Sequence, residues 1–144
     1  MTAFRPALVA RLALAYFASV FFIGFVLGVI RTLWIAPRLG EHVAELVEMP
    51  VMVAASFLVA RMLISRAAGI GIRAAALVGL AALVLLLCAE LAVVAFVRGQ
   101  TLADYVASRD PLSGSAYAIA LLLFAAMPAV ISHRRSPRRG MRPW

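Results

Sequence analysis

The chain has 144 residues, of which 65% are hydrophobic and only 14% are charged. Its mean hydropathy is +1.03, whereas an ordinary soluble domain is about half apolar and about a quarter charged. These values exclude a soluble globular domain, a disordered tail and a small secreted scaffold held by disulfide bonds. The class that remains is an integral membrane protein.

All 14 basic residues are arginines, and the formal net charge is +8. In a soluble protein, such a basic composition would suggest nucleic-acid binding. Here the arginines flank long apolar runs, so they are interpreted as signals of membrane topology. Membrane lipid is therefore the expected environment, and nucleic acid is not an expected partner.

Four segments are apolar enough to cross a bilayer, which takes about 20 residues of helix. They predict helices over about residues 8–36, 42–65, 70–98 and 111–132, followed by a basic C-terminal tail over residues 133–144. Between the last two helices, Thr101 and Asp104 form a capping pattern that predicts a short amphipathic helix in the second outer loop. The expected architecture is all-α, an integral membrane four-helix bundle in a single domain.

The arginines are divided unequally between the two ends of these helices. Ten lie in the N-terminal segment, the second connection and the C-terminal tail, whereas Arg31, Arg38, Arg98 and Arg109 lie at the opposite ends. The positive-inside rule then places both termini in the cytoplasm, in what we expect to be a bacterial inner membrane. All six acidic residues fall in the outer part of the molecule.

Residues 31–48 carry the most specific pattern of charges. Spacings of three and four would place each of two sets on one helix face: Arg31, Trp34 and Arg38, and Glu41, Glu45 and Glu48. A tight turn before Gly40 would bring three pairs together: Arg38 with Glu41, Trp34 with Glu45, and Arg31 with Glu48. Because an unpaired charge near hydrocarbon costs at least a few kcal/mol, this ladder is expected to join the first helix to the second. Pro37 leaves the register uncertain by a residue or two.

Glu90 lies well inside the third apolar segment, and we expect it to pair with Arg31 or with a polar group of the second helix. The complete predicted polar cluster comprises Arg31, Trp34, Arg38, Glu41, Glu45, Glu48, Glu90 and Arg98. His42 adds one imidazole beside these carboxylates, which is too few strong ligands to predict a metal site. No catalytic residue, metal or cofactor is predicted, because no known catalytic or phosphate-binding motif is present.

The segments RTLWIAPRLGEHVAELVEMP (31–50) and YVASRDPLSGSAYAIALLLFAAMP (105–128) resemble parts of small, uncharacterised four-helix membrane proteins of proteobacteria. The resemblance would cover most of the chain. It implies a four-span membrane protein and carries no function that can be transferred. Small multidrug-resistance transporters are of similar size, but they carry an essential glutamate in the first helix, where this chain has no acidic residue.

Three hypotheses follow from these features. The first is a structural or interaction component of the inner membrane, which packs with itself or within a larger complex. The second is a small oligomeric transporter or channel for protons or small ions that uses Glu90 with Glu45 and Glu48. The third, a membrane enzyme acting on lipid or quinone, is left open by the carboxylates and His42 but has no motif behind it.

Overall fold

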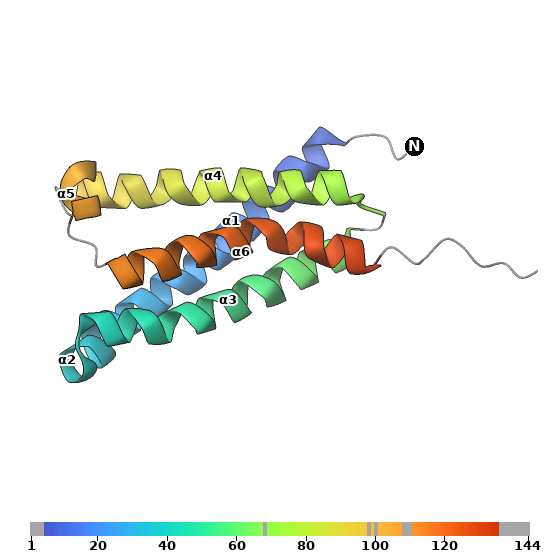
Figure 1. Cartoon of the computed structure of the whole chain (residues 1–144). Helices are drawn as coiled ribbons and strands as arrows, with labels where there is room; N and C mark the ends of the chain where they lie inside the picture. Colours follow the sequence, from blue (N-terminus) through green and yellow to red (C-terminus); the bar gives the residue numbers. More distant parts are fainter. Residues whose placement is uncertain (1–4, 68, 98, 100, 108–110, 136–144) are drawn as a thin grey trace, which may run out of the picture.

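The computed structural model describes residues 5–67, 69–97, 99, 101–107 and 111–135 of the chain. These residues form helices joined by short turns (Figure 1). The helices in chain order are α1 (Pro6–Ile30), η1 (Arg31–Ile35), α2 (Ala36–Leu39), α3 (Glu41–Arg66), α4 (Ile72–Val97), α5 (Leu102–Ala107) and α6 (Pro111–Arg135). The prediction of an all-α fold with four packed helices is confirmed.

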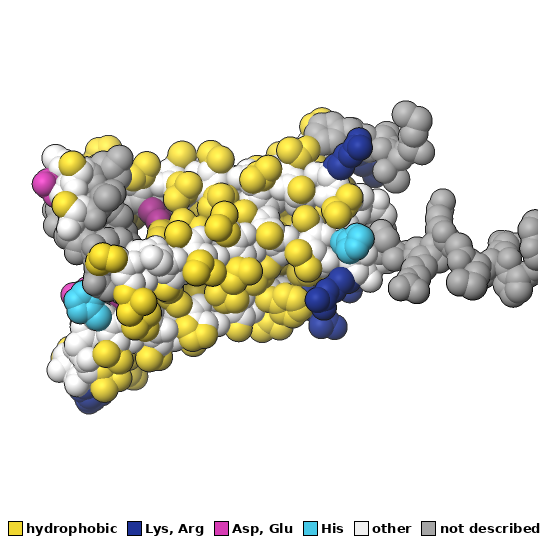
Figure 2. Space-filling view, in the orientation of Figure 1, with side chains coloured by type: hydrophobic (Ala, Val, Ile, Leu, Met, Phe, Trp, Pro, Cys, Tyr) yellow, Lys and Arg dark blue, Asp and Glu magenta, His cyan; other side chains and the backbone are white. Residues whose placement is uncertain are grey.

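Each of the four long helical stretches is long and apolar enough to cross a membrane: Pro6–Leu39, Glu41–Arg66, Ile72–Phe96 and Gly114–Arg135. Large hydrophobic side chains point outward along them, and Phe22, Leu80 and Leu122 are 65%, 54% and 68% exposed. Figure 2 shows hydrophobic side chains over the middle of the visible face. Apolar surface on this scale is normal against lipid and not against water. The chain is a four-span membrane protein.

Charged side chains gather at the two ends of the bundle (Figure 2). The arginine-rich end contains the start of α1, the α3–α4 connection and the end of α6, and its described arginines are Arg5, Arg11, Arg61, Arg66, Arg73, Arg134 and Arg135. The carboxylate end contains every acidic residue that the structure describes, namely Glu41, Glu45, Glu48, Glu90 and Asp104, together with Arg31 and Arg38. This separation agrees with the charge pattern of the sequence.

The four long helices are arranged so that each packs against two others. Helix α6 packs against α3 and α4, and α1 packs against the same two helices. Tyr16 of α1 and Phe124 of α6 stack across the centre of the bundle, with their ring centroids 4.4 Å apart. Both side chains are almost completely buried. Around them lies the main hydrophobic core, which includes Val20, Ala60 and Ile64.

Small residues set how closely the helices approach. A Cβ atom added to Gly79 of α4 would collide with the backbone carbonyl of Ala125 in α6, and Ala75, one turn before it, is fully buried. A Cβ atom on Gly24 of α1 would lie 3.1 Å from the Met52 side chain of α3, whereas one on Gly28 would meet nothing within 4 Å. Gly24 and Gly79 therefore serve contacts within one copy of the chain.

Pro128 leaves one backbone carbonyl of α6 without its helical hydrogen-bond donor, and Tyr16 supplies a donor instead. Proline has no amide hydrogen, so the carbonyl four residues earlier, that of Phe124, loses its usual helical donor. The Tyr16 hydroxyl donates a hydrogen bond to this carbonyl over 2.9 Å. An unsatisfied carbonyl in the membrane would cost several kcal/mol. The tyrosine thus compensates for the proline from the opposite side of the bundle.

The first long helix runs on to Leu39 because it absorbs Pro37 in a π-helical turn. The Ala36 amide donates to the carbonyl of Arg31, five residues earlier, in place of the usual four. This wider turn accommodates the missing amide hydrogen and the ring of Pro37. The chain then reverses at Gly40, whose φ of +81° favours glycine.

A capping pattern and a proline mark the starts of α5 and α6. The Asp104 amide donates to the Thr101 hydroxyl over 3.2 Å, and the Thr101 amide donates to the Asp104 carboxylate over 3.3 Å. This reciprocal capping confirms the short helix α5 that the sequence predicts. Helix α6 begins at Pro111, whose missing amide hydrogen and fixed φ suit the first position of a helix.

A double-mutant cycle can test whether the Tyr16 hydrogen bond compensates for the donor that Pro128 removes. Tyr16→Phe keeps the ring stack but removes the donor, so the free energy of unfolding should fall by about 0.6 to 1.7 kcal/mol, as for other hydrogen bonds between membrane helices. In a Pro128→Ala background, the backbone amide at position 128 can donate to the Phe124 carbonyl. Tyr16→Phe should then lower the free energy of unfolding by clearly less than it does with Pro128 present. Unfolding by denaturing detergent, followed by circular dichroism, measures both. An equal cost in the two backgrounds would contradict the pairing.

The orientation predicted from the arginines can be tested with single cysteines in a Cys88→Ser background. Ala103→Cys lies in α5 at the carboxylate end and should react with a membrane-impermeant maleimide in intact cells. Ser65→Cys lies at the arginine-rich end and should react only after the cells are permeabilised. The reverse pattern would show that the termini lie outside the cell.

Candidate functional site

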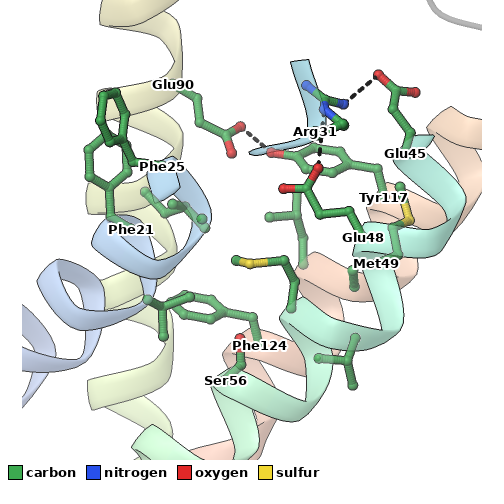
Figure 3. Close-up of a pocket in the computed structure, with 17 residues that line it drawn as sticks. Phe21, Phe25, Arg31, Glu45, Glu48, Met49, Ser56, Glu90, Tyr117 and Phe124 are labelled. Atoms are coloured by element: carbon green, nitrogen blue, oxygen red, sulfur yellow. Dashed lines mark hydrogen bonds and ion pairs between the residues drawn. The ribbon is translucent and has the colours of Figure 1, made fainter. Parts of the chain in front are cut away.

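A cavity of about 250 Å³ lies between all four long helices, in the half of the bundle nearer the carboxylate end (Figure 3). Its polar rim consists of Arg31, Glu45, Glu48, Glu90 and Tyr117. Its floor, deeper in the bundle, is mainly apolar and includes Val20, Phe21, Met52, Leu86, Leu121 and Phe124. Three of the predicted cluster's carboxylates and one of its arginines therefore line one cavity.

Arg31 holds the two glutamates of α3 together. Its Nη1 atom is 3.2 Å from Oε1 of Glu45, and its Nε atom is 3.2 Å from Oε2 of Glu48. The three side chains are only 19%, 25% and 17% exposed. Because Glu45 and Glu48 are three residues apart, they lie on one face of α3 and can reach the same guanidinium. We call these three residues the Arg31 cluster.

The predicted ladder of three pairs is only partly correct. The pairing of Arg31 with Glu48 is confirmed. Glu45 also bonds to Arg31, and Trp34, its expected neighbour, is 67% exposed. Arg38 donates to the Trp34 carbonyl over 3.5 Å instead of contacting Glu41. The π-helical turn explains the difference, since it adds a residue to one turn and moves the residues after Arg31 away from the 3.6-residue register.

Glu90 has a partner that the sequence analysis missed. The Tyr117 hydroxyl of α6 donates a hydrogen bond to the Glu90 carboxylate, whereas Arg31 or a group of the second helix was expected (Figure 3). The signal was a tyrosine in an apolar helix, where its hydroxyl needs a polar partner. The usual explanation for a tyrosine close to a helix end is interfacial anchoring, which hides this role.

The remaining predicted residues do not join the cavity lining that the structure describes. Glu41 and His42 are exposed at the start of α3, and Arg98 lies outside the described residues. Among the described residues, no group of three or more histidines, cysteines or acidic residues could hold a metal ion. The site in the described part of the chain is thus the Arg31 cluster with the Glu90–Tyr117 pair.

Glu90 lies inside the apolar span of α4, Ile72–Phe96, and not at its end. Helix α4 has 26 residues and is about 39 Å long, against a hydrocarbon thickness of about 30 Å. Glu90 lies seven residues before its end at Val97, which corresponds to about 10 Å. With α4 centred in the bilayer, Glu90 lies about 6 Å inside the hydrocarbon boundary. In the Arg31 cluster, one guanidinium faces two carboxylates of α3, which leaves a formal charge of −1.

A comparison with protein-family models, with curated proteins and with solved structures finds no match to this chain. The resemblance to four-helix proteobacterial proteins is therefore supported only at the level of the four-span arrangement. The function has to be inferred from the cavity itself.

The stabilising role of Arg31 can be tested by Arg31→Gln, which leaves Glu45 and Glu48 without their shared guanidinium. Uncompensated charges in a part-buried membrane site are costly, so the free energy of unfolding should fall by about 2 kcal/mol or more. Unfolding of the purified protein in mixed micelles, followed by circular dichroism, measures the change.

Arg38→Gln is the matched control, because Arg38 is an exposed arginine of the same helical stretch; its effect should stay within about 0.5 kcal/mol. Adding Glu45→Gln and Glu48→Gln to Arg31→Gln should restore much of the lost stability, since the unpaired charges are then gone. If Arg31→Gln is no less stable than Arg38→Gln, the cluster does not stabilise the fold.

Proposed function

We propose that the chain is a small cation-coupled membrane carrier, in which the carboxylates of the cavity exchange protons with a cationic solute. The observation that supports this most directly is that Glu45, Glu48 and Glu90, from two different helices, line one cavity. The formal negative charge of the Arg31 cluster calls for compensation by a proton or another cation. Proton and solute would therefore compete for the same carboxylates.

The titratable and charged groups that face the cavity come from all four long helical stretches. They are Arg31 from η1, Glu45 and Glu48 from α3, Glu90 from α4 and Tyr117 from α6. A bound cation would thus interact with side chains from each of the four long helical stretches. Such a common site is what a carrier needs if binding is to change the helix packing.

The packing of the other half favours a carrier over an open channel. Beyond the cavity floor, toward the arginine-rich end, Tyr16, Ala60, Ile64 and Ala75 are each at most 3% exposed. The described residues therefore close the path with a dense core. Release of a solute on that side would need a rearrangement of the helices, as in alternating access.

The proposed orientation follows the arginines, with both termini in the cytoplasm of a bacterial cell and the cavity near the outer face of the inner membrane. Four helices provide little wall around a transport path, so we propose that two or more copies assemble. This assembly would pack lipid-facing surfaces of the bundle together.

The ion pairs also favour a second candidate function, a structural membrane component in which the Arg31 cluster only joins η1 to α3. The two candidates differ in what loss of a carboxylate does. In a structural component, Glu48→Gln and Glu90→Gln would mainly lower the yield of folded protein. In a carrier they would spare the yield and abolish transport.

Transport can be tested in proteoliposomes that contain a trapped pH-sensitive dye, with the membrane potential clamped by potassium and valinomycin. After a pH step in the presence of external sodium, potassium or organic ammonium ions, the wild type should exchange protons faster than protein-free liposomes. Glu48→Gln and Glu90→Gln should reduce the rate to that of protein-free liposomes, because the exchanged site is lost.

Glu41→Gln is the control, since Glu41 is an exposed carboxylate at the same end that does not belong to the described lining of the cavity. Its flux should equal that of the wild type. Unchanged flux in well-folded Glu48→Gln and Glu90→Gln would reject the carrier. Loss of folded protein without any wild-type flux would favour the structural component.

A further inference from the structure

We infer that the cavity binds an amphipathic organic cation of small size, with its charged group at the Arg31 cluster and its apolar part on the floor. This inference rests on the proposed function, because it takes the same cavity as the cation site and names the class of solute. Three features support it: the charge of the rim, the chemistry of the floor and the depth and volume of the space between them.

The rim selects for positive charge. Arg31 shares one positive charge between Glu45 and Glu48, so these three residues alone keep a formal charge of −1. An anion would bring a second negative charge to a part-buried site and would be rejected. A permanently charged cation would restore neutrality without the need for protonation.

The floor selects for an apolar group beside that charge. Phe21 and Phe124 offer aromatic rings, and Met52 offers a flexible thioether that adapts to different shapes. Aromatic faces also attract cations through their quadrupole, most strongly where water is excluded. An inorganic ion would leave this apolar surface unused.

The spacing of rim and floor sets the shape of the solute. Met52 and Ser56 follow Glu48 by one and two helical turns, so they lie about 6 to 12 Å deeper along α3. Both residues line the cavity. Cavities that hold drug-sized molecules measure about 300–1,000 Å³, and this one measures about 250 Å³. A single ring or short alkyl chain attached to a small cationic head matches these dimensions.

Benzyltrimethylammonium is a suitable probe, because its quaternary nitrogen cannot lose a proton and it carries one aromatic ring. Isothermal titration calorimetry on the full chain in lipid nanodiscs would measure its binding. Tetramethylammonium keeps the charge without the ring, and phenylmethanesulfonate keeps the ring with the opposite charge. Tetramethylammonium should bind at least about tenfold more weakly, since burial of a ring is worth more than one decade, and phenylmethanesulfonate should show no binding.

Matched variants test the two parts of the site separately. Glu48→Gln neutralises the Arg31 cluster and should weaken binding of the probe at least about tenfold, whereas Glu41→Gln should not change it. Ala120→Phe places a ring into the cavity and should abolish binding. Ala118→Phe puts the same ring on an exposed position of α6 outside the described lining and should leave binding intact.

The inference fails if tetramethylammonium binds as tightly as the probe, or if folded Glu48→Gln or Ala120→Phe binds it like the wild type. Absence of probe binding in protein that shows Glu48-dependent flux of small inorganic cations also overturns it and leaves the carrier function standing. Conversely, binding with the expected dependences in protein that shows no flux rejects the carrier and supports the ligand class.

Discussion

The structure depends on one electrostatic constraint, which is that charges carried into the hydrocarbon must be compensated there. Arg31 contacts both Glu45 and Glu48 and compensates one of their two charges, and these contacts join the first long helix to α3. The contact requires the guanidinium to face α3 although Pro37 follows six residues later. The π-helical turn resolves that conflict, because it absorbs the proline without ending the helix. The ion pairs of Arg31 and the π-helical turn thus occur in the same segment, Arg31–Ile35.

A second constraint acts on the backbone in the centre of the bundle. Pro128 removes one helical donor, and Tyr16 supplies another from across the core. The half of the bundle that contains the arginine-rich end is densely packed around this contact. The other half, between Phe124 and the carboxylate end, contains the cavity and its three glutamates. The division into a dense half and a hollow half positions the candidate site on one side of the membrane, and it makes a continuous pore through a single copy incompatible with the described packing.

Composition and hydropathy were sufficient to predict the all-α, four-span architecture, because continuous apolar runs of about 20 residues are typical of membrane-spanning helices, which satisfy their own backbone groups in lipid. The pairing of Arg31 with Glu48 followed from helical spacing around the turn at Gly40. The same geometry failed for Trp34 and Arg38, since a regular helix was assumed where the chain forms a π-helical turn. The contact of Tyr117 with Glu90 joins residues 27 positions apart, and such contacts depend on which helices become neighbours. That information comes from packing at small residues such as Gly79 and is not contained in local spacing.

Helices α4 and α6 approach each other closely at Gly79 and Ala125. The Glu90–Tyr117 hydrogen bond joins these same two helices, whereas the ion pairs of Arg31 join η1 to α3. These polar contacts therefore lie within two pairs of helices, the first long stretch with α3 and α4 with α6. Because α3 also packs against α6 and α1 against α4, a movement of one pair relative to the other would keep these polar contacts but would have to change the apolar packing between the pairs. The stack and hydrogen bond between Tyr16 and Phe124 add a third connection between the two pairs, in the centre of the bundle.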